Sequence, residues 1–158
     1  MTLSCDIDGV LIKSLNKFVD DRGWLTEMFR VDDIDEAYRP LMAYVSMTRP
    51  GVVRGPHEHA DQADCFCFIG PSTFRLYLWD NRKESPTHGK HVTLDVGEEA
   101  PTQVIVPKGV VHGYKNIGET EGIVYNAPNR LYAGWNRAEP VDEIRHESDP
   151  DSPFRIDD

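Results

Sequence analysis

The amino-acid sequence predicts an all-β protein, built as a sandwich or barrel of short strands. Strand-like runs recur at short spacing, turn-forming residues separate them, and a single short segment has a helical pattern. Thr73–Asp80 is the clearest run, because Phe74, Leu76 and Leu78 occupy every second position, which is the period of a half-buried strand. Jelly rolls belong to the set of architectures that this pattern favours.

The first expected strands are Gly9–Lys13, Leu41–Thr48 and Asp64–Ile69. The second of these runs ends at Arg49-Pro50-Gly51 and the third at Gly70-Pro71-Ser72. Pro and Gly supply the backbone angles that tight turns require, so both boundaries are well marked.

The remaining expected strands are Thr73–Asp80, His91–Val96, Gln103–Val106 and Gly122–Ala127. Turn-forming residues fill the stretch from 81 to 89, and Pro107-Lys108-Gly109 follows the Gln103 strand. Asp32–Tyr38 is the one segment expected to be helical, with Asp32 or Asp33 as its N-cap.

The segment from Glu139 to Asp158 differs from the rest, because it is acidic and carries Pro140, Pro150 and Pro153. We expect an extended tail over residues 139–158 that lies on the barrel. Residues 1–158 are expected to form a single domain, since 158 residues can bury a core without disulfide or metal support.

Composition excludes several classes of protein. A net charge of −10 argues against a nucleic-acid-binding protein, which would present a basic face. No apolar run approaches the roughly 18 residues of a membrane span, and the N-terminal residues lack a signal-peptide pattern, so a cytoplasmic protein is expected. Cys5, Cys65 and Cys67 are an odd set that fits reduced thiols, with Cys65 and Cys67 packed on a strand.

Histidines mark two short segments. The first runs from Gly51 to His59 and contains His57, and the second runs from Pro107 to Asn116 and contains His112. On a strand, His57 and His59 project from one face, and the Pro-x-Gly turn allows His112 to enter the same cavity. Three imidazoles and one carboxylate are suitable ligands for zinc, iron or manganese. The alternative is that they are hydrogen-bonded polar groups at the mouth of a barrel.

Both segments resemble the signature motifs of the cupin superfamily, and further matches in chain order resemble the dTDP-4-dehydrorhamnose 3,5-epimerase family. These matches extend over most of residues 9–130. They are Asp20–Trp24 with Glu27 and Phe29, Arg54-Gly55-x-His57, Gln62-Ala63, Asp80-Asn81-Arg82, Ser85–Gly89, Ile105–Tyr114 and Val124-Tyr125. The resemblance implies a cupin jelly roll (a double-stranded β-helix barrel), a homodimer, a nucleotide-diphosphate sugar as substrate, and neither a metal nor a cofactor.

The chemistry that this resemblance implies is epimerisation at C3, C5 or both of a nucleotide-linked 4-keto-6-deoxy sugar. A base removes a proton beside the carbonyl, and an acid returns one on the opposite face. The resemblance makes His57 the base and Tyr125 the acid. The implied substrate-binding residues are Arg22, Glu27, Arg54, His59, Gln62 and His112.

Three departures from the family pattern stand out. Asp64 occupies the place of a family lysine, and His59 that of a glutamine. The chain also ends before the family's C-terminal region, which supplies an aspartate partner for the catalytic histidine. We therefore expect Asp64 to act in catalysis as the carboxylate partner of one histidine. Met42 and Tyr44 occupy positions that, in the family this chain resembles, contact the nucleotide base, so the identity of the base is open.

Three other functions stay open at this point. A sugar-nucleotide 3,4-ketoisomerase uses a histidine pair on one face of the sugar. A metal-dependent cupin would use His57, His59, Asp64 and His112 as ligands. A non-catalytic sugar-binding cupin needs neither the lysine nor the aspartate. Metal content separates the second of these from the others.

Overall fold

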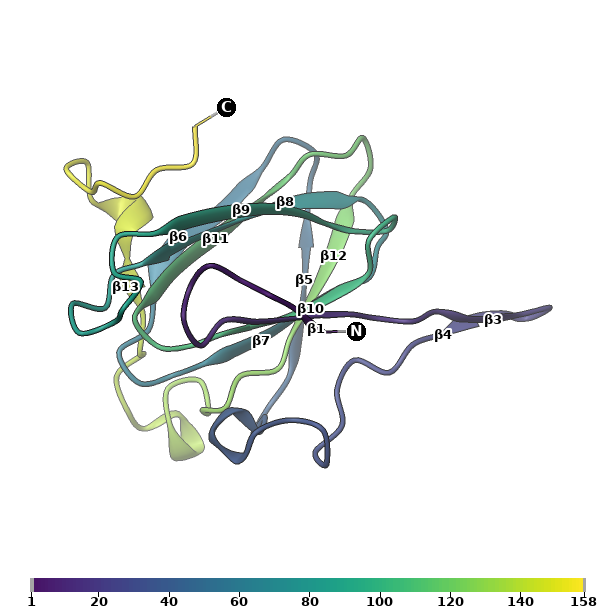
Figure 1. Cartoon of the computed structure of the whole chain (residues 1–158), viewed down its shortest axis with the longest axis horizontal. Coiled ribbons are helices and arrows are strands. Elements are labelled where there is room, and N and C mark those ends of the chain that lie inside the picture. The colour runs from purple at the N-terminus through teal and green to yellow at the C-terminus, as the bar shows by residue number, and fades with distance from the viewer. Residues whose placement is uncertain (1, 158) are drawn as a thin grey trace.

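The computed structural model describes residues 2–157, so Met1 and Asp158, the two ends of the expected domain, lie outside the described residues. Two antiparallel β-sheets face each other and enclose a common core (Figure 1). This arrangement is a cupin-like jelly roll, which confirms the predicted fold class.

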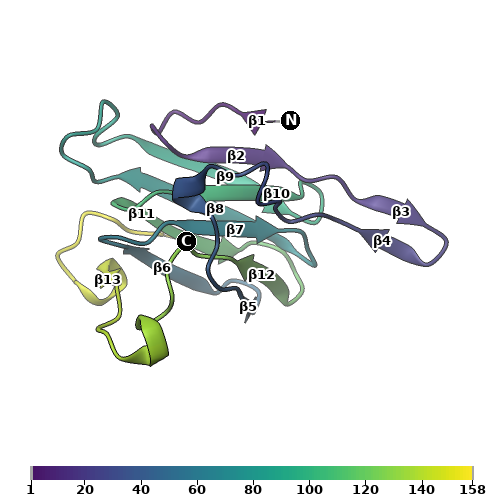
Figure 2. The ribbon, with the colours of Figure 1, turned by 90° about the horizontal axis from the view of Figure 1, so that it is seen from below.

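The first sheet has six strands in the order β1-β2-β10-β7-β12-β5 (Figure 2). Each neighbouring pair is antiparallel, and every pair except β1 and β2 joins strands that are not consecutive in the chain. The strands are β1 (Thr2–Leu3), β2 (Leu11–Ser14), β5 (Tyr44–Thr48), β7 (Asp64–Phe68), β10 (Thr102–Val106) and β12 (Gly122–Asn126).

The second sheet has five strands in the order β13-β6-β11-β8-β9. They are β6 (Val53–Glu58), β8 (Thr73–Asp80), β9 (His91–Gly97), β11 (Val110–Asn116) and β13 (Ile144–Arg145). A separate hairpin of β3 (Phe18–Asp20) and β4 (Gly23–Leu25) extends from the body as a long arm (Figure 1).

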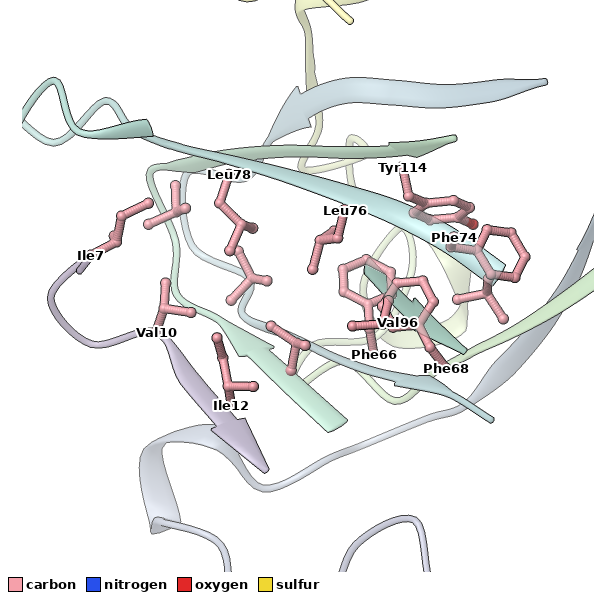
Figure 3. Packing of buried hydrophobic residues seen from close by; sticks show 14 residues of the cluster. Ile7, Val10, Ile12, Phe66, Phe68, Phe74, Leu76, Leu78, Val96 and Tyr114 are labelled. Atoms are coloured by element: carbon pink, nitrogen blue, oxygen red, sulfur yellow. The ribbon is translucent and has the colours of Figure 1, made fainter. Parts of the chain in front are cut away.

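The core lies between the sheets and is filled by aromatic and branched side chains (Figure 3). Phe66 and Phe68 enter it from β7, and Phe74, Leu76 and Leu78 enter it from β8, as the alternation of β8 predicts. Every residue of β7 is buried, because smaller clusters with the segment from Met28 to Tyr38 cover its outer face. Cys65 and Cys67 pack there as free thiols, as expected.

The helix predicted at Asp32–Tyr38 is shorter in the structure than the sequence indicated, so the predicted bounds are wrong. Only Glu36–Tyr38 is helical, as one 3-10 turn, and Asp35 rather than Asp32 or Asp33 caps it by accepting from the backbone N–H of Ala37. Two other single 3-10 turns are Trp135–Arg137 and His146–Ser148. None of the helices described between residues 2 and 157 is long and apolar enough to cross a membrane.

The acidic tail is part of the second sheet. Ile144 and Arg145 form β13, which pairs with Glu58 and His57 of β6. Farther along, the ring of Phe154 packs 5.9 Å from that of Trp79. The tail therefore lies on the barrel beside the strand that carries His57.

Candidate functional site

Three histidines from the two sequence motifs converge at one end of the barrel. His57 on β6 pairs in register with His112 on β11, and His59 follows β6. The rings of His57 and His112 are 4.6 Å apart, and the ring of His59 lies 5.5 Å and 5.6 Å from them. One nitrogen from each ring lies within 4.8 Å of the others. The geometry thus unites the two motifs in a single cluster.

Asp64 reaches this cluster from the opposite sheet, as the first residue of β7. Its Oδ2 lies 3.0 Å from Nε2 of His59 and 3.1 Å from Nε2 of His112. Its Oδ1 accepts hydrogen bonds from the side-chain amides of Gln62, at 2.9 Å, and Asn126, at 2.8 Å. The carboxylate expected beside one histidine therefore lies against two, His59 and His112.

The tail supplies groups at the other side of the histidine rings. His59 donates from Nδ1 to the backbone carbonyl of Asp142, whose carboxylate accepts three backbone N–H groups from residues 60 to 62. Nδ1 of His57 lies 3.8 Å from Oε1 of Glu143. Sequence reasoning missed Asp142 and Glu143, because no motif marks them and only the pairing of β13 with β6 brings them here.

Burial and neighbouring charges shift the pKa values of the cluster's members in different directions. Burial lowers the pKa of His57 to about 3, and the rings of His112 and His59 act in the same direction. Burial would also lower the pKa of His59, but its contact with Asp64 outweighs burial and raises that pKa to about 9. Burial would raise the pKa of Asp64, yet the rings of His112 and His59 hold it well below its usual range. His57 is therefore neutral beside an ionised Asp64 at pH 7.

A cavity of about 730 Å³ opens beside His57 and His59, within the size range of small-molecule sites. Gln62 lies on its wall, and Asp64 and His112 are buried behind His59. Its other walls include the cationic and aromatic side chains of Tyr44, Arg130, Tyr132, Trp135 and Arg137 together with the apolar Leu41 and Met42. From the sequence, Met42 and Tyr44 were candidate binding positions. Residues 130–137 were not identified there, because they follow the last recognised motif.

Tyr44 is the tyrosine that the fold connects to the histidine cluster. Its hydroxyl accepts a 2.8 Å hydrogen bond from the amide of Asn126, and the same amide donates to Asp64. Burial, followed by the negative charge of Asp64, raises the pKa of Tyr44 above its usual value. The phenol therefore keeps its proton throughout the physiological pH range.

Tyr125, the expected acid, lies on the outer face of the first sheet. Side chains alternate along β12, and Val124 and Asn126 face the barrel interior, so Tyr125 between them faces outward. There it packs in the cluster that contains Cys67 and Met28. Within one chain, Tyr125 and His57 therefore lie on opposite sides of the first sheet.

The expected cationic residues also lie outside this cavity. Arg54 donates from Nε to Oγ1 of Thr48 at 2.8 Å, which ties β6 to β5. Arg22 is at the tip of the β3–β4 arm, pairs with Asp20, and has 86% of its side chain exposed. Glu27 follows the arm and lies 3.5 Å from Arg30. Neither Arg22, Glu27 nor Arg54 is among the described residues that line the cavity of their own chain.

Comparison with known proteins gives a consistent result. The sequence model of the dTDP-4-dehydrorhamnose 3,5-epimerase family matches residues 4–140. The probable low-salt glycan biosynthesis epimerase Agl13 of Haloferax volcanii is 39% identical over 129 residues, which cover 80% of this chain and 81% of that protein. The spore coat polysaccharide biosynthesis protein SpsL of Bacillus subtilis is 39% identical over 114 residues, 72% of this chain and 74% of SpsL.

Solved structures show the same fold. The dTDP sugar isomerase of Desulfovibrio desulfuricans superposes with a TM-score of 0.84 at 20% identity, covering 97% of this chain and 94% of that one. NovW of Streptomyces spheroides, a 4-keto-6-deoxy sugar epimerase, superposes with a TM-score of 0.77 at 25% identity, covering 98% of this chain and 79% of NovW.

Proposed function

The chain belongs to the dTDP-4-dehydrorhamnose 3,5-epimerase family, and from this premise we propose how its histidine site acts. The protein is an isomerase, an epimerase of a nucleotide-linked keto sugar. The proposed substrate is a nucleotide-diphosphate 4-keto-6-deoxy sugar, inverted at C3, C5 or both. The observation that carries this proposal is a neutral histidine, His57, on the wall of a cavity large enough for such a ligand.

His57 is the proposed base. A proton on a carbon beside a carbonyl is acidic, and a neutral imidazole at the cavity wall can accept it. The imidazolium that results faces Glu143, whose carboxylate lies 3.8 Å from Nδ1 and stabilises the new positive charge. Glu143 is in turn held by Arg145, which donates to Oε2 at 2.7 Å. We assign Glu143 as the positioning residue for His57.

Tyr44 is the proposed acid, in place of Tyr125. It lines the same cavity as His57 but extends from the opposite sheet, so a sugar bound between them presents different faces to the two side chains. The protonated phenol can then return a proton to the face that His57 does not reach. Inversion follows from removal on one face and return on the other.

Deuterium exchange in D₂O tests these roles with a 4-keto-6-deoxy sugar nucleotide. The wild-type chain should incorporate deuterium at C3, C5 or both, with inversion. His57→Ala should lose about two to four powers of ten in exchange rate, because no other group removes the proton. The matched control is His91→Ala, which changes an imidazole on the outer side of β9 beside Trp79. Full exchange in His57→Ala would contradict the base assignment.

The two tyrosines are separated by the same assay. Tyr44→Phe should still exchange through His57 but retain configuration, since the deuteron returns from the base's own face. Tyr125→Phe should form epimer at the wild-type rate. The reverse result, with inversion lost in Tyr125→Phe and kept in Tyr44→Phe, would restore Tyr125 as the acid.

Binding of the nucleotide diphosphate is proposed for the rim of the cavity. Arg130 and Arg137 lie on its wall, and a guanidinium donates bidentate, charge-assisted hydrogen bonds to phosphate. Met42 and Trp135 offer apolar surface to a nucleotide base. His59 and Gln62, expected as substrate-binding residues, lie deeper, at the sugar end. Arg54 stays a proposed binding residue that would act from β6.

The exposed apolar residues of the β3–β4 arm are the basis on which a homodimer is proposed. Val19 and Trp24 on β3 and β4 are 76% and 50% exposed, and within residues 2–157 no strand pairs with the outer edge of β5 in the first sheet. Exposed apolar strands and a free edge together favour association with a second copy. The arm would then carry Arg22 and Glu27 to that copy, where they can bind substrate.

Sedimentation equilibrium tests the homodimer. The wild-type chain should have twice the chain mass, and Val19→Glu combined with Trp24→Glu should have the chain mass with unchanged circular dichroism. A monomeric wild-type chain would exclude the dimer. The molecule is proposed to act as one domain in the cytoplasm, where its three free thiols stay reduced.

A second candidate function is 3,4-ketoisomerisation. The observation that favours it is the His57–His59 pair, since both rings line the cavity and lie 5.5 Å apart. Such a pair can move a proton along one face of a sugar. Product analysis discriminates between the candidates, because ketoisomerisation moves the carbonyl from C4 to C3, whereas epimerisation leaves it at C4.

A further inference from the structure

Asn126 is a buried side chain that joins two residues of the site and that the proton-transfer roles leave unused. It is 1% exposed and lies on β12, between β5, which carries Tyr44, and β7, which carries Asp64. Its amide nitrogen, Nδ2, lies 2.8 Å from the hydroxyl oxygen of Tyr44 and 2.8 Å from Oδ1 of Asp64. The two N–H bonds of this nitrogen can therefore serve both neighbours at once.

The orientation of the Asn126 amide is determined by its other partners. Oδ1 of Asn126 accepts a 3.1 Å hydrogen bond from the backbone N–H of Cys65, which can only donate. The ionised carboxylate of Asp64 can only accept, so Nδ2 must be the atom that faces it. The reverse orientation would lose both bonds. The side chain therefore presents an N–H group, and not a carbonyl oxygen, to the hydroxyl of Tyr44.

This orientation determines where Tyr44 can direct its own proton. The hydroxyl oxygen accepts from Asn126, which offers no acceptor in return. Within residues 2–157 that hydroxyl has no further hydrogen-bond partner, and Tyr44 lies on the wall of the cavity. The O–H bond is therefore free to turn toward a ligand in the cavity.

The other buried asparagines of the described chain have different partners. Asn129 is 7% exposed, accepts from the backbone N–H of Ala63 and donates to the backbone carbonyl of Ala37. Asn116 is 0% exposed and donates to two backbone carbonyls. These two amides connect loops and strands, whereas Asn126 contacts the proposed acid. Asn129 is thus a matched control for Asn126.

We propose that Asn126 is the positioning residue for Tyr44, which directs the hydroxyl proton toward the sugar and stabilises the phenolate that remains. This inference rests on the proposed function, because it assigns a support to the acid of that reaction. When Tyr44 protonates the enolate, its O–H bond breaks and a C–H bond forms at the sugar carbon, and the electron pair stays on the phenolate oxygen. The N–H of Asn126 donates to this oxygen before and after the transfer, more strongly once the oxygen is charged.

The support is needed because the phenolate forms close to a negative charge. Burial and the charge of Asp64 raise the pKa of Tyr44, whereas the hydrogen bond from Asn126 lowers it. Without this donor, Tyr44 would hold its proton more tightly, and the direction of its O–H bond would no longer be fixed. Tyr44 regains a proton from water after the product leaves, since 47% of the residue is exposed.

The first test measures inversion and deuterium exchange together, in D₂O, with the full chain and a 4-keto-6-deoxy sugar nucleotide. Asn126→Asp keeps the shape of the side chain but turns an oxygen toward Tyr44, so the phenol donates to this oxygen instead of the sugar. The new carboxyl shares one proton with Asp64, which leaves the net charge of the pair unchanged. The ratio of inversion to exchange should fall at least about tenfold, while exchange and KM change little.

Asn129→Asp is the control for this ratio. It should lower stability, because an oxygen then faces the carbonyl of Ala37, but the ratio of inversion to exchange should equal that of the wild type. A wild-type ratio in Asn126→Asp would overturn the inference. An equal loss of inversion and exchange in Asn126→Asp would also overturn it, since that result marks a structural role.

Nuclear magnetic resonance of the side-chain amides tests the same contact without substrate and without the Asn126→Asp variant. In Tyr44→Phe one amide proton of Asn126 loses its acceptor and should shift upfield, while the amide protons of Asn129 keep their wild-type shifts. Unchanged Asn126 resonances would overturn the inference. A shift in a chain that shows no exchange in D₂O supports the positioning of Tyr44 and contradicts the epimerase mechanism. Exchange with inversion and no shift does the opposite.

Discussion

Two buried aspartates, Asp64 on β7 and Asp80 at the end of β8, are each 1% exposed but have opposite surroundings. Both oxygens of Asp80 are bonded, by the guanidinium and backbone N–H of Arg82 and by the hydroxyls of Ser85 and Thr87. Only one oxygen of Asp64 is bonded in this way. A saturated carboxylate stabilises a turn, whereas the free oxygen of Asp64 faces two ring nitrogens and raises the pKa of His59.

The same substitution at the two positions should therefore have different effects. Asp64→Asn should lower epimerisation about 100- to 1000-fold, because it removes the charge that organises His59 and His112. Its free energy of unfolding should stay within about 1 kcal/mol of the wild type, since the amide can donate to the ring nitrogens while Oδ1 keeps its two donors. Steady-state kinetics and urea unfolding measure both quantities. A large loss of stability with normal turnover would show that Asp64 is a structural residue like Asp80.

Asp80→Asn should cost about 2–3 kcal/mol of stability, since the new amide turns N–H groups toward Arg82, Ser85 and Thr87, which are all donors. Turnover at a temperature where the variant is folded should stay within about threefold of the wild type. Urea unfolding at pH 7 measures the cost. A turnover loss as large as that of Asp64→Asn would remove the distinction between the two carboxylates.

Gly109→Ala tests the contact between Asp80 and Arg82 from the side of Arg82. Gly109 has a φ of +75°, and a Cβ there would lie 2.6 Å from Cγ of Arg82. The left-handed backbone and this contact should together cost about 1–2 kcal/mol, because Arg82 must move from Asp80. The control is Gly89→Ala, which has a φ of +81° but, among the described residues other than its two chain neighbours, no atom within 4 Å of the new Cβ. Equal costs for the two variants would exclude the contact with Arg82 as a contributor.

The pH dependence of Asp80 gives the smallest expected effect. Burial would raise the pKa of Asp80, but the bonds from Arg82, Ser85 and Thr87 outweigh burial and hold that pKa well below its usual range. The ionised carboxylate therefore stabilises the fold above the unfolded pKa of about 4 and loses this effect as the pH falls toward the folded value. Unfolding at pH 3 should show the difference between wild type and Asp80→Asn reduced by about 1 kcal/mol. An increase in that difference would contradict the sign.

Sequence reasoning succeeded where one residue pattern determines the structure. The alternation in β8 predicts its bounds, Thr73–Asp80, as the structure has them. The arm of β3 and β4 and the short β13 were missed, because strands of two or three residues carry no readable period. The outward direction of Tyr125 depends on its neighbours Val124 and Asn126, and motif order alone does not reveal it.

The difference between Asp64 and Asp80 was also beyond the sequence. Donors for Asp80 come from the next seven residues, and the motif that contains them was visible. Partners for Asp64 come from three other strands and loops, with Asn126 62 residues away. Hydrogen-bond saturation is thus a property of the folded chain, and only the structure separates a carboxylate that stabilises a turn from one that sets the charge of neighbouring histidine rings.

Nitrogen-15 chemical shifts of the histidine rings, followed against pH in the wild type, Asp64→Asn and Asp80→Asn, test this central difference most directly. The account predicts a pKa of about 9 for His59 in the wild type and in Asp80→Asn, and a lower pKa in Asp64→Asn, because the contact with the Asp64 carboxylate is what raises it. The same His59 pKa in all three chains would contradict it.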